Sequence, residues 1–143
     1  MEKKFKFPKD FRDFPNEKVG IEKIGWYMHY VPSGDGTPFG ANAHTHGFAE
    51  NYDHPDIQIC VPVDPKIMHS IFWTVFNDFI SKGIKLKPGK YYNGIIQNYN
   101  MLALEAEECD RQVIRLCVPD AQGEYKGEYG KQLTMLKHKT EDE

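Results

Sequence analysis

Apolar and polar residues alternate along three early segments, the pattern of a β-strand with one buried face. Residues 25–31 are rich in aromatic side chains, and residues 56–62 place Ile57, Ile59 and Val61 on one side. Residues 39–46 alternate most clearly, with Phe39, Ala41, Ala43 and Thr45 on one face and Gly40, Asn42, His44 and His46 on the other. Residues 32–38 contain Gly and Pro, so we expect the first two strands to form a hairpin. The polar residues 47–55 are expected to form a turn.

A long helix is predicted over residues 65–82. Asp64 is a good N-cap residue, Pro65 suits the first helical position, and Gly83 is typical just beyond a helix end. The apolar residues of the segment form a broad stripe: Ile67, Met68, Ile71, Phe72, Val75, Phe76, Phe79 and Ile80. A helix with so wide an apolar face has to pack across a sheet.

The second half of the chain predicts further strands. Residues 91–97 form one, and residues 101–107 and 112–118 form a second hairpin, although the first of these also contains good helix formers. Residues 119–130 have the composition of a loop, and residues 132–136 could form a last strand. The segments together predict the α+β class: a mostly antiparallel sheet, which could close in a barrel-like way, packed against one main amphipathic helix.

The length of 143 residues suits one domain. Residues 1–18 carry four phenylalanines among charges and prolines, and are expected to form an N-terminal arm that packs these rings on the domain. Residues 19–136 are expected to form the single α+β domain. The charged residues 137–143 are expected to form a frayed tail.

Composition argues against several classes of protein. The net charge is −3 and no long run of Lys or Arg occurs, which argues against binding to nucleic acid. No apolar run approaches the roughly 20 residues of a membrane-spanning helix. The N-terminus lacks the apolar stretch of a secretory signal, so we expect a cytoplasmic protein. The three cysteines, Cys60, Cys109 and Cys117, are expected to be reduced and buried.

The chemistry of the chain concentrates in one histidine-rich segment. His44 and His46 are two positions apart on a predicted strand, so both imidazoles leave the same face. His54 and Asp56 follow the turn and could complete three or four ligands for Zn²⁺ or Fe²⁺. An open coordination position on that ion could bind and activate water.

The same residues also fit a site without a metal. The histidines could pack among tyrosines or line a pocket for a small ligand. Residues 54–56 could form an ordinary turn in which Asp56 accepts backbone N–H groups. His29, in the neighbouring predicted strand, could join the site if the hairpin register allows it.

Several short motifs follow one another in a recognisable order. They are Gly25-Trp26, Thr45-His46-Gly47-Phe48, His54-Pro55-Asp56 and residues 115–120, followed by Gly123 and Gln132-Leu133. This order resembles the bacterial domain-of-unknown-function family numbered 4262, over about residues 19–136. The resemblance implies a small α+β domain and no particular activity. The chain departs from many relatives in having His44 and His46 around the threonine, and its segment 91–111 is shorter.

Three functions follow from these observations. The first is a small-ligand- or metal-binding protein, hydrolytic or not, centred on His44, His46, His54 and Asp56. The second is a non-enzymatic binding protein, such as an immunity-type inhibitor of a bacterial toxin, with a surface of acidic residues and tyrosines formed by Glu124, Tyr125, Glu128 and Tyr129. The third is a flavin binder, by analogy with split-barrel folds. The sequence assigns no substrate, reaction or oligomeric state, and leaves open whether the protein is an enzyme.

Overall fold

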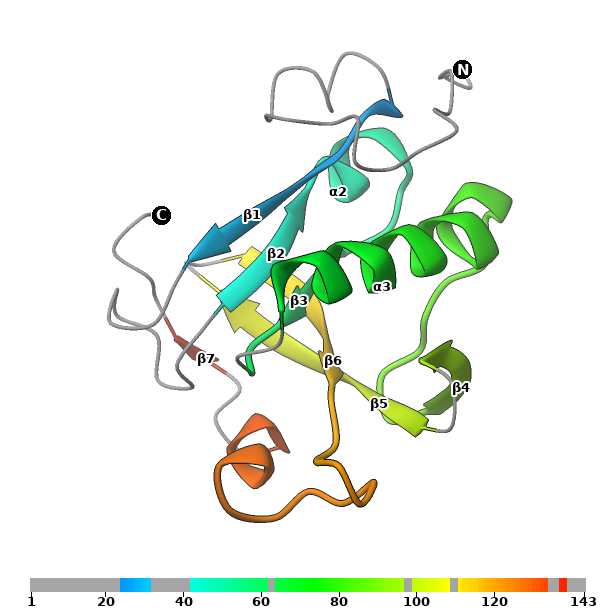
Figure 1. Cartoon of the computed structure of the whole chain (residues 1–143). Coiled ribbons are helices and arrows are strands. Elements are labelled where there is room, and N and C mark those ends of the chain that lie inside the picture. The colour runs from blue at the N-terminus through cyan, green and yellow to red at the C-terminus, as the bar shows by residue number, and fades with distance from the viewer. Residues whose placement is uncertain are drawn as a thin grey trace.

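A seven-stranded sheet runs through the molecule, with one long helix lying across it (Figure 1). The structure is a computed structural model that describes residues 24–31, 42–61, 64–96, 99–108, 111–133 and 137–138. Predictions for residues 1–18, 32–41, 134–136 and 139–143, and for Cys109, concern parts of the chain outside this description. The strands are β1 (Tyr27–Val31), β2 (Asn42–His46), β3 (Asp56–Ile59), β4 (Tyr91–Ile96), β5 (Tyr99–Glu108), β6 (Arg111–Cys117) and β7 (Lys137–His138).

The strands lie in the order β1-β2-β3-β6-β5-β4, and β7 pairs with β5 beside this path. Both predicted hairpins are confirmed, since β1 pairs antiparallel with β2, and β5 with β6. The pairs β2–β3 and β4–β5 are antiparallel too, whereas β3 pairs in parallel with β6, and β5 with β7. The predicted α+β class is therefore confirmed. The barrel-like closure is wrong, because the sheet stays open and a helix occupies one face where a barrel would have its interior.

Helix α3 (Pro65–Asp78) begins as the sequence predicts. The Asp64 carboxylate accepts a hydrogen bond of 2.9 Å from the backbone N–H of Lys66. The helix ends earlier than predicted, because Phe79 leaves helical geometry at φ −126° and ψ −65°. The chain continues as a 3₁₀ turn, η2 (Ile80–Lys82), which Gly83 closes at φ 76°. Ile67 is 49% exposed, so the buried stripe is narrower than the sequence indicates.

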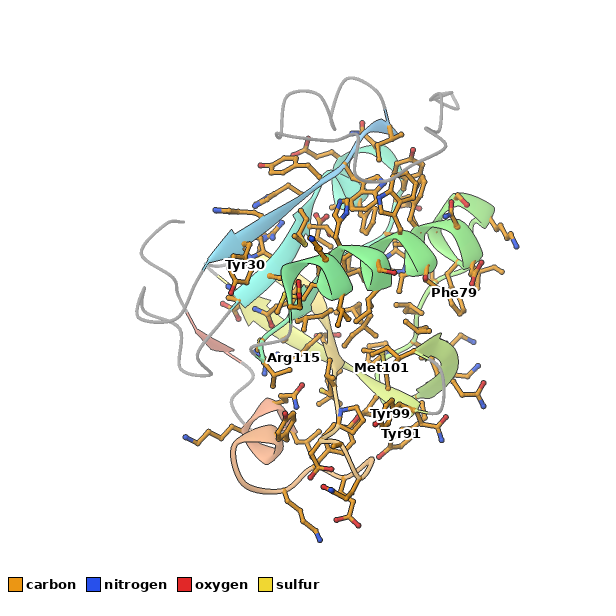
Figure 2. All side chains as sticks on the ribbon, in the orientation of Figure 1. Tyr30, Phe79, Tyr91, Tyr99, Met101 and Arg115 are labelled. Atoms are coloured by element: carbon orange, nitrogen blue, oxygen red, sulfur yellow. The ribbon has the colours of Figure 1, made fainter. Side chains whose placement is uncertain are left out.

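The hydrophobic core lies between α3 and one face of the sheet. Figure 2 shows side chains of the helix and the sheet filling this layer, with Met101 among them, and Met101 is fully buried. Trp26 anchors the start of β1, because its ring packs against Phe48, Trp73 and Phe76 with centroid separations of 5.0, 5.3 and 5.5 Å. This cluster fixes the first hairpin against the helix.

A short helix, α2 (Phe48–Asn51), occupies part of the segment that the sequence assigns to a turn. Gly47 precedes it at φ 113°, and a Cβ at this position would lie 2.1 Å from the carbonyl oxygen of Gly25. Only glycine fits a backbone approach this close. Among the described helices, none combines the length and the apolar character needed to cross a bilayer.

Polar side chains run across the middle of the opposite sheet face. His29, His44, Gln58 and Arg115 are direct neighbours on β1, β2, β3 and β6, and we call these four residues the polar row. Three of them, His44, Gln58 and Arg115, are fully buried. Buried polar groups are costly without hydrogen bonds. Two of the three guanidinium nitrogens of Arg115 have partners, because Nε donates to Gln58 Oε1 at 2.8 Å and Nη1 donates to the carbonyl oxygen of Gln132 at 3.0 Å.

The C-terminal part of the described chain packs on this polar face as a 3₁₀ segment, η3 (Gly127–Leu133). The predicted strand over residues 132–136 is wrong for its first two residues, which lie in η3, and strand β7 begins only at Lys137. The cause is the buried Gln132 side chain. Its amide accepts from the backbone N–H of Val118 at 2.7 Å and donates to the carbonyl oxygens of Val118 and Tyr129 at 2.8 Å each.

Candidate metal centre

Three imidazoles gather on the first hairpin. His29 on β1 lies directly opposite His44 on β2, and His46 follows His44 by two positions on the same strand face. One ring nitrogen from each of the three histidines lies within 4.8 Å of the others. The ring centroids are 4.8 Å apart for His29 and His44, 4.9 Å for His44 and His46, and 5.7 Å for His29 and His46. We call these three residues the histidine cluster.

Two nitrogens of the cluster already have the spacing of metal ligands. Nε2 of His44 and Nδ1 of His29 are 3.2 Å apart. Two nitrogens bound to one tetrahedral Zn²⁺ at about 2.0–2.1 Å would themselves be roughly 3.3 Å apart. The ring nitrogen of His46 lies within 4.8 Å of the other two.

The cluster has a buried side and a side facing solvent. His44 is fully buried, whereas His29 and His46 are partly exposed. The ring of Tyr27 stacks on that of His46, with centroids 5.1 Å apart and an interplanar angle of 24°. Asn42 places its Oδ1 atom 3.3 Å from Nδ1 of His44 on the buried side. His29 and His46 are therefore the members of the cluster that solvent reaches.

His54 lies outside the cluster and connects two loops. Its Nδ1 donates to the carbonyl oxygen of Pro55 at 2.7 Å, and its Nε2 accepts from the backbone N–H of Leu86 at 3.1 Å. Burial lowers the pKa of His54, and the hydrogen bond to Pro55 works in the opposite direction. Both ring nitrogens therefore have protein partners, and the neutral ring joins the turn after α2 to residue 86.

Asp56 also lies outside the cluster, and four donors surround its carboxylate. Oδ1 accepts from the Thr45 hydroxyl at 2.8 Å and from the backbone N–H of Phe48 at 3.0 Å. Oδ2 accepts from the backbone N–H of Ala49 at 3.4 Å and from Nη1 of Arg111 at 3.3 Å. Burial raises the pKa of Asp56, while the Thr45 hydrogen bond and the Arg111 cation oppose this. The carboxylate therefore caps the first turn of α2.

One known protein family matches most of the chain. The model of a domain of unknown function, DUF4262, matches residues 20–118. The chain belongs to this family. The matched part of the DUF4262 domain runs from before β1 to the end of β6 and contains the whole histidine cluster. No curated protein and no solved structure matches the chain.

In this DUF4262 domain, the structure brings together His44 and His46 of the four residues predicted for the site, and adds His29. Alternation along β1 gives the face of His29, but its place opposite His44 depends on the hairpin register. His54 and Asp56 have the separate partners described above. Sequence reasoning missed the burial of Gln58 and Arg115 beside the cluster. A signal existed for Arg115, because a lone arginine interrupts the apolar run of β6.

Of the four residues predicted to form a surface for a protein partner, the structure describes the side chains of Glu124, Tyr125 and Tyr129, and the binding of a partner stays a prediction. The Tyr125 hydroxyl donates to the carbonyl oxygen of Cys117 at 2.9 Å, and Tyr129 packs against the core. Glu124 forms an ion pair with Lys126. The contacts of the two tyrosines attach the segment around η3 to the rest of the domain, whereas the ion pair of Glu124 is local. The sheet is not closed into a barrel, so the fold does not support the split-barrel analogy behind the flavin alternative, and flavin binding itself stays untested.

Proposed function

We propose that this DUF4262 domain binds a divalent transition-metal ion, Zn²⁺ in the first place, through His29, His44 and His46. The observation that carries the proposal is the convergence of three imidazoles from two adjacent strands to within 4.8 Å. Two of these rings already face each other through ring nitrogens, Nε2 of His44 and Nδ1 of His29. The 3.2 Å separation of His44 Nε2 and His29 Nδ1 matches neighbouring ligands on one ion.

The ligand set favours zinc over iron. Non-haem Fe²⁺ sites commonly combine two histidines with one carboxylate. The nearest candidate carboxylate in the sequence prediction, Asp56, is surrounded by four donors and is not a member of the cluster. Three neutral imidazoles with one open position correspond to a zinc site that binds water or substrate.

Such a site would supply hydrolytic chemistry. A zinc ion with three histidine ligands lowers the pKa of its bound water to about 7, which provides hydroxide at neutral pH. The buried position of His44 holds one side of the ion away from solvent, and the partly exposed His29 and His46 leave access to the other. We therefore propose a metal-assisted hydrolase as the reaction class of this domain.

The test is a titration of the full chain, made without a polyhistidine tag and stripped with chelator, with Zn²⁺ and with Co²⁺ as a spectroscopic probe. We expect one ion per chain and a tetrahedral Co²⁺ spectrum. At a free Zn²⁺ concentration of 100 times Kd, the free energy of unfolding should rise by about 2.7 kcal/mol. Absence of stoichiometric binding in folded protein would end the proposal.

Single variants locate the ligands. His29→Gln, His44→Gln and His46→Gln should each weaken Zn²⁺ binding by at least the roughly 10- to 100-fold that loss of a supporting residue costs at metal sites. The matched control is His69→Gln, because His69 is a partly exposed histidine on α3 that lies outside the cluster. His54→Gln distinguishes the ligands predicted from the sequence, which include His54, from those of the histidine cluster, which include His29. If His54→Gln weakens Zn²⁺ binding and His29→Gln does not, the ligands predicted from the sequence are the correct ones.

A further inference from the structure

We propose that Asn42 is a positioning residue of the metal site, an inference that rests on the proposed metal binding. Asn42 and His44 are two positions apart on β2, so their side chains share a face. Both residues are fully buried, and Oδ1 of Asn42 lies 3.3 Å from Nδ1 of His44. Histidines that bind metals usually donate their second ring N–H to a fixed acceptor, which sets the orientation of the ring.

The contact selects one tautomer of His44. An amide oxygen can only accept a hydrogen bond, so Nδ1 of His44 has to carry the ring proton. In the neutral ring Nε2 then has the lone pair, and this is the nitrogen that faces Nδ1 of His29 at 3.2 Å. The opposite tautomer would direct an N–H group at the ion and remove His44 from its ligands. Asn42 therefore decides which nitrogen of the buried histidine is available.

The same reasoning assigns the ligand atom of His29. Without metal, Nε2 of His44 accepts, so Nδ1 of His29 donates across the 3.2 Å contact. Coordination of an ion by both nitrogens would require the His29 proton to move from Nδ1 to Nε2 through solvent, so that the Nδ1 lone pair could hold the ion. The number of protons on the two rings does not change. The site thus pairs Nε2 of His44 with Nδ1 of His29.

Two substitutions at Asn42 test the role in opposite directions. Asn42→Leu keeps the approximate shape but removes the acceptor, and should weaken Zn²⁺ binding by about 10- to 100-fold. Asn42→Asp keeps an acceptor that cannot donate, so its Kd should equal that of the wild type or be lower. The matched control is Asn93→Leu, the same change at an exposed strand position, which should leave the Kd unchanged.

The second readout is the tautomer itself, measured by nitrogen-15 NMR of the imidazole rings in metal-free protein. The wild type and Asn42→Asp should show Nδ1–H at His44, with the resonance assigned by its loss in His44→Gln. The spectrum of the wild-type protein is sufficient for this test, even if the variants at Asn42 do not fold. An Nε2–H tautomer in the wild type, or a folded Asn42→Leu protein that binds Zn²⁺ like the wild type, would overturn the role of Asn42 and leave the metal site intact. A wild-type chain that binds no Zn²⁺ would instead remove the proposed function.

Discussion

Replacing Asp56 by alanine distinguishes a structural carboxylate from a metal ligand. The residue is 4% exposed and joins three parts of the chain: β2 through Thr45, the start of α2 through Phe48, and β6 through Arg111. Alanine leaves these donors without their common acceptor. We expect a large loss of stability and an unchanged affinity of the folded protein for Zn²⁺.

The magnitude follows from how buried each donor is. The bonds from the Thr45 hydroxyl and the Phe48 N–H are short and fully buried, and each hydrogen bond to a charged group contributes about 1.5–3 kcal/mol. The Arg111 contact is longer, at 3.3 Å, and its side chain is 28% exposed, so solvent screening leaves it a small contribution. Asp56→Ala should therefore lower the free energy of unfolding by about 3–5 kcal/mol, or the Tm by roughly 10–15 °C.

The assay is urea unfolding followed by tryptophan fluorescence, since Trp26 and Trp73 are both buried in the core. The matched control is Asp120→Ala, because Asp120 Oδ1 also accepts two backbone N–H groups, at 3.0 and 2.9 Å, but in an exposed turn. Asp120→Ala should lower the free energy of unfolding by about 1 kcal/mol or less. A loss below about 1 kcal/mol for Asp56→Ala, with a large loss of Zn²⁺ affinity, would refute the structural reading.

Two further outcomes follow from the backbone and from a buried ring. Gly47→Ala should lower the free energy of unfolding by more than about 4 kcal/mol, because its Cβ would lie 2.1 Å from a backbone oxygen. Gly94→Ala should lower it by only about 1–2 kcal/mol, because Gly94 has φ 87° but open space around it. Equal losses of stability in thermal melts of the two variants would contradict this. Burial lowers the pKa of His54 in the folded chain, so as the pH falls the unfolded chain takes up a proton on this ring before the folded chain does. The free energy of unfolding should therefore decrease as the pH drops below about 6.5. In chelator, His54→Gln should flatten that decline in urea midpoints, and an unchanged pH profile would exclude this role.

Much of the fold could be predicted from local signals. The Asp64 cap, the following proline and the apolar periodicity fix the start and the buried face of α3, because each acts within a few residues. Alternation fixes the face of each strand in the same way. The sequence alone therefore places His44 and His46 on one side of β2. The two antiparallel hairpins follow from strands that are close in sequence.

The composition of the candidate site was decided by contacts between distant parts of the chain. His29 joins the two histidines on β2 because the register of the hairpin places it opposite His44. His54 does not join them, because its Nε2 accepts a hydrogen bond from the backbone N–H of Leu86, 32 positions away. The parallel pairing of β3 with β6 puts Gln58 beside Arg115. The carbonyl oxygen of Gln132 in η3 then accepts a hydrogen bond from the buried guanidinium of Arg115. A local pattern gives a side chain its direction, whereas only tertiary packing gives it neighbours.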